Sequence, residues 1–311
     1  MIVTSLVNEF AFQQFYFTTF FPRTQPKIQR QILGRMSKAL VSLRRTWYNG
    51  TKNFQREEPI MSNYRIVFSP TGGTAKVSRI LTDALGGVWQ DIDLCRQITP
   101  MTFTAQDLCL VAVPSYGGRV PGIAIDRIKA LRGGGAKALL VCVYGNREWE
   151  DTLTELQDAL EAVGFACAAA VAAVAEHSIF RQYAAGRPDA DDAAQLAAFA
   201  GTIREAMASG TCHPLELAGS HGTYKAFNGV PFKPEGNKKC VACGLCADSC
   251  PTGAIDAADP RKTDKDKCIS CMRCVGLCPQ HARDLSPLVM KPAGAAMATK
   301  LGGRKDNHLF L

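Results

Sequence analysis

The chain has 311 residues, enough for about two domains, and its 47% hydrophobic and 21% charged residues are typical of a globular protein with a sizeable core. The net charge of +8 is concentrated at the start, because residues 1–60 hold nine Lys and Arg against three Asp and Glu, which leaves +2 for residues 61–311. A nearly neutral body excludes the basic footprint of a nucleic-acid-binding protein, so no nucleic-acid partner is expected.

Residues 1–61 differ from the rest of the chain. An aromatic stretch, Phe10–Phe21, is followed by a basic polar stretch, Arg23–Arg56. No apolar run reaches the roughly 18–20 residues of a transmembrane helix, and the positive charge follows the apolar part instead of preceding it, as a signal peptide requires. Met61 starts a segment that reads like an ordinary protein start. We predict that residues 1–61 are a disordered or non-native extension; an aromatic arm for a membrane surface or a partner is the alternative.

From residue 62 onward, apolar strands alternate with helices. The expected strands are Tyr64–Phe68, Val88–Leu94, Asp107–Val113, Ala138–Val143 and Phe165–Val174, and the expected helices are Thr74–Leu85, Gly122–Leu131, Asp151–Val163 and Asp189–Ala208. This alternation predicts an α/β domain over residues 62–211, with a doubly wound parallel sheet covered on both faces.

The loop after the first strand has the composition of a phosphate site. It reads Ser69-Pro70-Thr71-Gly72-Gly73-Thr74 and leads directly into a helix. A glycine turn at a helix N-terminus offers free N–H groups and the positive end of the helix dipole to an anion. The loop lacks the lysine of a P-loop and the GxGxxG of a dinucleotide site, so it suits a mononucleotide phosphate. The alternative is a plain tight turn with Thr74 as the N-cap.

Two further loops follow strands of the same sheet. One contains Ser115, Tyr116 and Gly117, and the other contains Tyr144, Gly145, Asn146 and Trp149. Open α/β sheets bind ligands at the carboxyl ends of their strands, where all three loops lie. Aromatic side chains beside glycines suit stacking on a planar ring. Tyr116 and Trp149 have surface packing as their alternative role.

The cysteine-rich segment carries the strongest motif. Residues 212–235 read as a connector, residues 236–285 as a cysteine domain and residues 286–311 as a tail. Two runs of the form CxxCxxCxxxCP supply Cys240, Cys243, Cys246 and Cys250, then Cys268, Cys271, Cys274 and Cys278. Three closely spaced thiolates wrap one 4Fe–4S cluster, and the fourth cysteine of each run ligates the other cluster. We therefore assign Cys278 to the first cluster and Cys250 to the second. Zinc, which is usually held by two CxxC pairs, is the alternative.

The remaining cysteines and the histidines have no comparable pattern. Cys95, Cys109, Cys142, Cys167 and Cys212 are scattered, mostly in apolar strands, and are expected to act as small buried hydrophobes. His177, which follows the fifth strand, is expected to be a solvated loop residue, with a place beside a flavin as the alternative; His213, His221 and His281 are expected to be ordinary. Thiolate ligands need a reducing compartment, which predicts a cytoplasmic protein.

Both parts resemble known families. Residues 236–285, with Cys250-Pro-Thr-Gly-Ala-Ile and Cys278-Pro279, resemble the bacterial two-cluster ferredoxins. Residues 62–210 resemble the flavodoxin family, which implies strand order 2-1-3-4-5 and an FMN bound by three loops. The residues that this resemblance assigns to FMN are Ser69, Thr71, Gly72, Gly73 and Thr74 for the phosphate, and Ser115, Tyr116, Gly117, Tyr144, Gly145 and Asn146 near the ring. The chain departs from that family in lacking an obvious acidic surface and a tryptophan in the second loop.

The whole arrangement resembles the fused flavodoxin–ferredoxin proteins known as EFR-type ferredoxins. The resemblance implies an electron carrier that moves electrons between two 4Fe–4S clusters and FMN, with an unidentified redox partner protein. An FMN-dependent reductase of an unknown substrate and a ferredoxin with a flavin-free docking domain are the alternatives.

Overall fold

The computed structural model describes residues 62–211 and 214–311, and residues 60–311 form one compact unit. The predicted extension at residues 1–61 and Cys212 and His213 lie outside the described residues.

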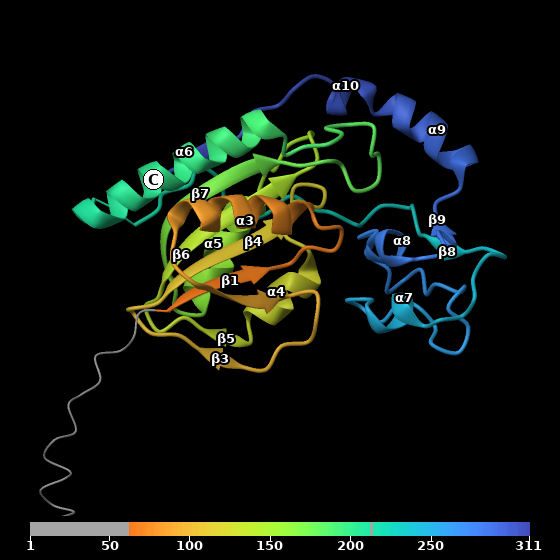
Figure 1. Cartoon of the computed structure of the whole chain (residues 1–311), viewed down its shortest axis with the longest axis horizontal. Helices are drawn as coiled ribbons and strands as arrows, with labels where there is room; N and C mark the ends of the chain where they lie inside the picture. The colour runs from red at the N-terminus through yellow and green to blue at the C-terminus, as the bar shows by residue number, and fades with distance from the viewer. Residues whose placement is uncertain (1–61, 212–213) are drawn as a thin grey trace, which may run out of the picture. The chain divides into compact units, whose positions relative to one another are not determined.

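A six-stranded sheet forms the centre of the first part of this unit (Figure 1). Its strands are β1 (Asn63–Val67), β2 (Trp89–Asp93), β4 (Leu108–Pro114), β6 (Lys137–Tyr144), β7 (Ala166–Val174) and β10 (His308–Phe310). They lie in the order β10-β7-β6-β4-β1-β2, and every pair is parallel except β10 with β7. The five parallel strands thus have the order 2-1-3-4-5 of flavodoxin-like doubly wound sheets.

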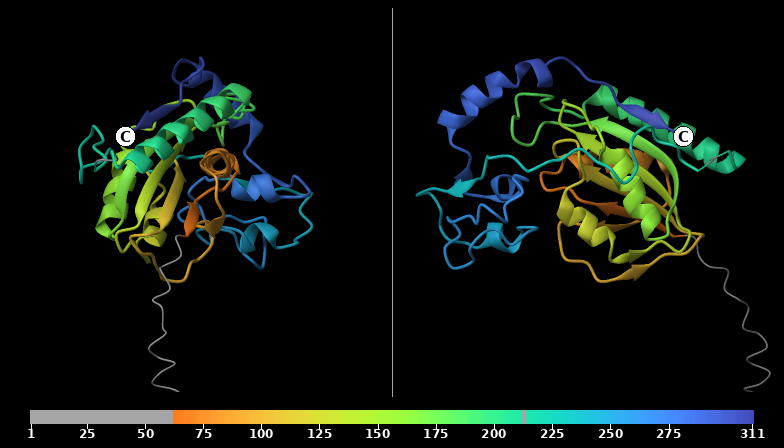
Figure 2. Two further views of the ribbon diagram at one scale, coloured as in Figure 1. Left: turned by 60° about the vertical axis from the view of Figure 1, so that its left-hand side comes forward. Right: turned by 180° about the vertical axis from the view of Figure 1, so that it is seen from behind.

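The strands are apolar because helices cover both faces of the sheet (Figure 2). The helices are α3 (Gly73–Leu85), α4 (Gly122–Ile128), α5 (Thr152–Ala162) and α6 (Ala190–Ser209). Val77 and Leu81 of α3 pack with Leu196 of α6 against one face, in a core that includes Leu139. Ile128 of α4 packs with the α5 leucines against the other face. Burial on both sides explains why β4 and β6 read as continuous apolar runs.

A small parallel pair lies outside this sheet. It consists of β3 (Met101–Thr102) and β5 (Leu131–Arg132). Each strand has only two residues, too few for the alternation that predicts a strand from sequence.

The cysteine-rich segment has little regular structure and an internal repeat. Its elements are β8 (Glu235–Gly236), α7 (Leu245–Asp248), α8 (Arg273–Leu277) and β9 (Arg283–Asp284), and β8 pairs antiparallel with β9. Both short helices begin after a residue in the left-handed backbone region: Gly244, with φ 78°, precedes α7 and Met272, with φ 60°, precedes α8. The two halves therefore repeat the same local conformation.

The last residues form more structure than the predicted tail. They contain α9 (Pro287–Ala296), α10 (Ala298–Leu301) and β10. Asn307 fixes the segment to the sheet: its Oδ1 accepts the Val174 N–H at 2.8 Å, and its Nδ2 donates to Asp192 Oδ1 at 3.0 Å and Gln195 Oε1 at 2.8 Å. The chain therefore leaves the sheet after α6 and returns to it after the cysteine-rich segment.

Candidate functional site

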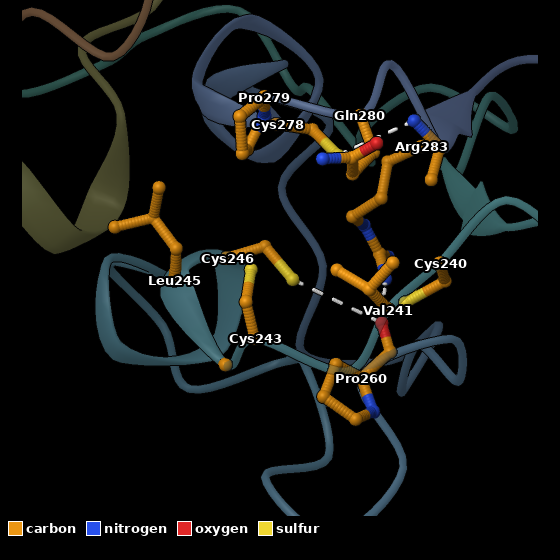
Figure 3. A pocket seen from close by; sticks show the side chains of 12 residues that line it. Cys240, Val241, Cys243, Leu245, Cys246, Pro260, Cys278, Pro279, Gln280 and Arg283 are labelled. Carbon is orange, nitrogen blue, oxygen red and sulfur yellow. Dashed lines mark hydrogen bonds between the residues drawn. The ribbon is translucent and has the colours of Figure 1, made fainter.

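The eight cysteines line two separate hollows. Cys240, Cys243 and Cys246 line one together with Cys278, and Cys268, Cys271 and Cys274 line the other together with Cys250. Figure 3 shows the side chains around the first hollow, with Cys278 opposite the cysteines of the earlier run. The hollows have nearly equal volumes of about 330 and 340 Å³, including space open to solvent. The fourth cysteine of each run thus lies at the hollow of the other run, the grouping expected from the motif.

The number of cysteines at each hollow matches the ligand set of one 4Fe–4S cluster. Four thiols line each hollow, three from one run and the fourth from the other. Over residues 62–211 and 214–311, no group of three or more His, Cys, Asp or Glu side chains is arranged to hold a single metal ion.

Backbone N–H groups support the fourth cysteine of each run in the same way. Ala254 N–H donates to Cys250 Sγ and Ala282 N–H donates to Cys278 Sγ, each at 3.3 Å. Burial alone would raise the pKa of the Cys278 thiol, but neighbouring N–H groups, led by that of Ala282, and the charge of Arg283 lower it below its usual value. Donors aimed at the sulfur favour the thiolate that binds iron and tune its cluster.

Burial distinguishes the other ligands. Cys243 is exposed, whereas Cys246 and Cys271 are buried. Burial raises the pKa of the Cys271 thiol to about 12, so this thiol loses its proton at neutral pH only when a metal takes its place.

The glycines of the cysteine runs act through backbone conformation. A relief of crowding at Gly244 and Gly276 is one expectation from the sequence. A Cβ on Gly244 would come no closer than 4.0 Å to a protein atom, and one on Gly276 would meet no protein atom within 4 Å. At Gly244 the requirement is the positive φ of 78°, which glycine adopts without strain. No crowding by protein atoms explains Gly276.

The Ser69–Thr74 loop has the donors that a phosphate requires. Ser69 Oγ accepts the Ala75 N–H at 2.9 Å and so shapes the turn. The N–H groups of Gly72, Gly73 and Thr74 have no hydrogen-bond acceptor among the described residues. A Cβ on Gly73 would lie 3.2 Å from the Ala175 Cβ, so the loop passes close to the end of β7. The N-cap of α3 is Gly72, not Thr74, and makes no side-chain cap, so the expectation of Thr74 as N-cap was wrong.

The second loop is hydrogen-bonded to its neighbours in the sheet domain. Ser115 N–H donates to Val143 O at 2.8 Å, and Ser115 Oγ accepts from the Thr152 hydroxyl at 2.8 Å. Burial raises the pKa of Tyr116 well above its usual value, and the charges of Cys271 and then Cys95 raise it further.

The connector covers part of this second loop. A Cβ on Gly117 would lie 2.2 Å from the ring of Phe227, and Gly117 has φ 63°. Arg119 pairs with Glu155 at 2.7 Å, donates to Lys225 O at 2.7 Å and lies 4.9 Å from the Tyr224 ring centroid. The connector is thus attached to the sheet domain and is no free linker.

The third loop is engaged with the C-terminal segment. The Tyr144 hydroxyl donates to Asp306 O at 2.6 Å, and the Asn146 amide donates to the carbonyls of Leu301 and Gly303. The ring centroid of Trp149 is 5.2 Å from that of Tyr144 and 4.9 Å from that of His308. Trp149 therefore has the packing role considered as its alternative, and the Tyr144 and Asn146 side chains hold the chain end.

His177 and the scattered cysteines are structural. His177 lies in a loop and is half-buried, and its Nδ1 accepts the N–H groups of Ile179 and Phe180, each at 3.1 Å. Burial lowers its pKa to about 4, and the charge of Arg147 adds to this. His221 pairs with Asp158. The described members of the scattered set are all buried, as expected: Cys95, Cys109, Cys142 and Cys167.

A buried arginine, Arg127, and a half-buried one, Arg273, connect the second cluster site to the sheet domain. Arg127 is 6% exposed and donates to Leu94 O and, at 2.8 Å, to Pro251 O. Arg273 lies between Cys271 and Cys274 and approaches Ser69 O at 3.5 Å and Asp93 at 3.9 Å. Sequence reasoning missed these arginines, because single arginines carry no pattern; the position of Arg273 inside a cysteine run was the one available signal.

No helix within residues 62–211 or 214–311 combines the length and the apolarity that a membrane crossing demands.

Solved structures of several flavoproteins are similar to part of the chain. The flavodoxin of Streptococcus pneumonia TIGR4 has 18% sequence identity over 48% of this chain and 99% of its own, with a TM-score of 0.34. Oxidised flavodoxin 1 from Bacillus cereus has 12% identity over 46% and 97%, with a TM-score of 0.34. The rubredoxin oxygen:oxidoreductase of Desulfovibrio gigas has 16% identity over 49% and 37%, with a TM-score of 0.33.

No curated protein sequence matches the chain significantly. Residues 239–282 match the family model of the 4Fe-4S dicluster domain, and this stretch contains all eight cysteines of the two hollows. The cysteine-rich segment is a two-cluster iron–sulfur domain.

Proposed function

We propose that the protein transfers electrons between its two 4Fe–4S clusters and an FMN bound at the ends of β1 and β4. The observation that supports this most is the contact of the second cluster site with the sheet domain. Arg273, inside the second cysteine run, approaches the Ser69 carbonyl at 3.5 Å, and Arg127 of α4 donates to the carbonyl of Pro251, next to Cys250. A bound FMN takes one or two electrons and would join single-electron carriers to a two-electron partner.

The phosphate of FMN would lie at the N-terminus of α3. The free N–H groups of Gly72, Gly73 and Thr74 are donors suited to a dianion, and the helix dipole adds to their attraction. Ser69 keeps the turn in shape through its bond to Ala75. Thr71 is exposed, like Gly72, and would contribute its hydroxyl.

The ring would be held by fewer side chains than the sequence suggested. Ser115, Tyr116 and Gly117 remain in the proposed ring site. At the third loop, the side-chain hydrogen bonds of Tyr144 and Asn146 go to the C-terminal segment, so that loop, with Gly145, would contribute chiefly through its backbone.

The two clusters have different places in this scheme. The second cluster, with Cys250, Cys268, Cys271 and Cys274, is the one that exchanges electrons with the flavin. The first has the exposed ligand Cys243 and exchanges electrons with an outside redox protein. A reducing compartment such as the cytoplasm suits these thiolate ligands.

A ferredoxin with a flavin-free docking domain is the second candidate. It is favoured by the contact of the Phe227 ring with Gly117, because this aromatic ring covers a part of the loop that would face an isoalloxazine. The two candidates differ in one measurable quantity, the flavin content of protein that has both clusters.

The test is anaerobic reconstitution of the full chain with iron and sulfide, followed by addition of FMN and quantification of all three. We expect about one FMN per two clusters, and flavin reduction when the clusters receive electrons. Gly73→Val should abolish flavin binding and leave the iron content unchanged, because its side chain would press on Ala175 and obstruct the loop. Gly201→Val, at a position with no atom within 4 Å, is the matched control. Protein with full iron and no flavin would refute the proposal and support the docking domain.

A further inference from the structure

Arg283 is a buried cation with neutral partners. Its side chain is among the largest fully buried ones, and the residue is 2% exposed. The guanidinium donates to Pro234 O at 2.9 Å, to Pro260 O and to the Thr263 hydroxyl. Its Nε is buried and has no hydrogen-bond partner in the described protein. These three acceptors are uncharged, so the bonds to them do not neutralise its charge.

The position of Arg283 places this charge between the two cluster sites. Arg283 lines the first hollow, and Figure 3 shows its side chain extending toward the Pro260 carbonyl. Its acceptor Pro260 lines the first hollow, and its acceptors Pro234 and Thr263 line the second. The guanidinium therefore lies between the linings of the two hollows.

An isolated charge in a protein interior is strongly unfavourable unless an opposite charge lies near it. A 4Fe–4S cluster with four thiolate ligands carries a net negative charge, and this charge grows by one when the cluster is reduced. The attraction of a nearby cation is therefore larger for the reduced cluster than for the oxidised one.

We propose that Arg283 is a shared electrostatic positioning residue that raises the reduction potentials of both clusters. Its hydrogen bonds to Pro234, Pro260 and Thr263 keep the cation in place. The inference rests on the iron–sulfur part of the proposed function and not on FMN, so it stands or falls independently of flavin binding.

The test compares Arg283→Gln with Arg261→Gln in the full chain. Arg261 is an exposed arginine close to the same hollow, paired with Asp259, so its loss removes the same formal charge from a solvated position. Iron and sulfide content first establishes that both clusters are present. Potentiometric titration followed by electron paramagnetic resonance then gives the potential of each cluster.

We expect Arg283→Gln to lower the equilibrium constant for one-electron reduction of both clusters at least tenfold, or about 59 mV each. Arg261→Gln should change them much less. Potentials that shift no more than in the control, or a shift in one cluster alone, would overturn the proposal.

Arg283→Lys distinguishes the effect of the positive charge from the effect of the hydrogen bonds. It is the variant to measure if Arg283→Gln fails to hold both clusters. A lysine keeps the charge but lacks the planar fork that reaches three acceptors. The proposal requires potentials close to those of the unchanged protein in this variant. If the equilibrium constant for reduction falls tenfold or more in this variant, although the charge is retained, Arg283 acts through structure alone and the proposal is overturned.

Discussion

The crossed grouping of the cysteines makes a prediction about pairs of substitutions. Cys278 lies in the second run of the sequence but at the hollow of Cys240, Cys243 and Cys246. None of the eight cysteines of the two runs lines both hollows, so the loss of one thiolate affects one cluster. Cys278→Ala should therefore remove half of the iron, with the cluster of the second hollow retained.

The double variants give the decisive magnitudes. Cys240→Ala with Cys278→Ala removes two ligands of the same hollow and should again leave half of the iron. Cys240→Ala with Cys268→Ala removes one ligand from each hollow and should leave none. If each run held its own cluster, the first pair would lose all of the iron and Cys240→Ala with Cys250→Ala would keep half.

The assay is iron and sulfide quantification after anaerobic reconstitution, with electron paramagnetic resonance of the reduced protein to count the surviving clusters. Cys95→Ala removes a buried cysteine outside both hollows and should leave the iron content unchanged. Complete loss of iron in the Cys240 and Cys278 pair, with half retained in the Cys240 and Cys250 pair, would refute the crossed assignment.

Three further outcomes are expected elsewhere in the fold. Folding lowers the pKa of His177 from 6.5 to about 4, so on acidification the unfolded chain binds this proton before the folded protein does, and the free energy of unfolding should fall by about 2 kcal/mol between pH 7 and pH 5. In thermal-shift measurements over this pH range, His177→Gln should lose less stability than the unchanged protein. Equal pH profiles for the two proteins would contradict this prediction. Gly117→Ala puts a side chain on a residue with positive φ, at a cost of about 1–2 kcal/mol, and its methyl group would press on the Phe227 ring. Limited proteolysis of the connector should therefore become faster. An unchanged cleavage rate would count against the contact between Gly117 and Phe227. Asn307→Ala leaves the Val174 N–H unpaired at a cost of about 1–3 kcal/mol, which faster hydrogen exchange at that amide should report; undiminished protection would contradict the role of Asn307.

Local patterns in the sequence were sufficient for most of the sheet domain. The apolar runs around Leu110 and around Leu139 predict two central strands, and the structure has β4 and β6 there. The runs are apolar because both faces of the sheet are covered. The cysteine spacing likewise predicts the two hollows, since a cube imposes a fixed order of thiolates on a short loop. Both signals are contained within a few consecutive residues.

The features that sequence reasoning missed depend on contacts between distant segments. β10 has three residues and no periodicity, and it becomes a strand because Asn307 and its neighbours meet the edge of β7. Arg127 and Arg273 are single residues whose importance comes from carbonyls far away in the chain, at Pro251 and Ser69. The third loop was assigned to a flavin because nothing local indicates that Asn146 binds the chain end.

Because the chain returns to the sheet through β10, the cysteine-rich segment lies between two parts of the chain that both belong to the sheet domain. It is an insertion held at both ends, with the connector attached at Lys225 before it and Asn307 after it. If either attachment to the sheet domain were lost, the other would still hold the cysteine-rich segment to that domain. Such double tethering limits how far a cluster can swing away, which is useful where electrons must cross a short gap repeatedly.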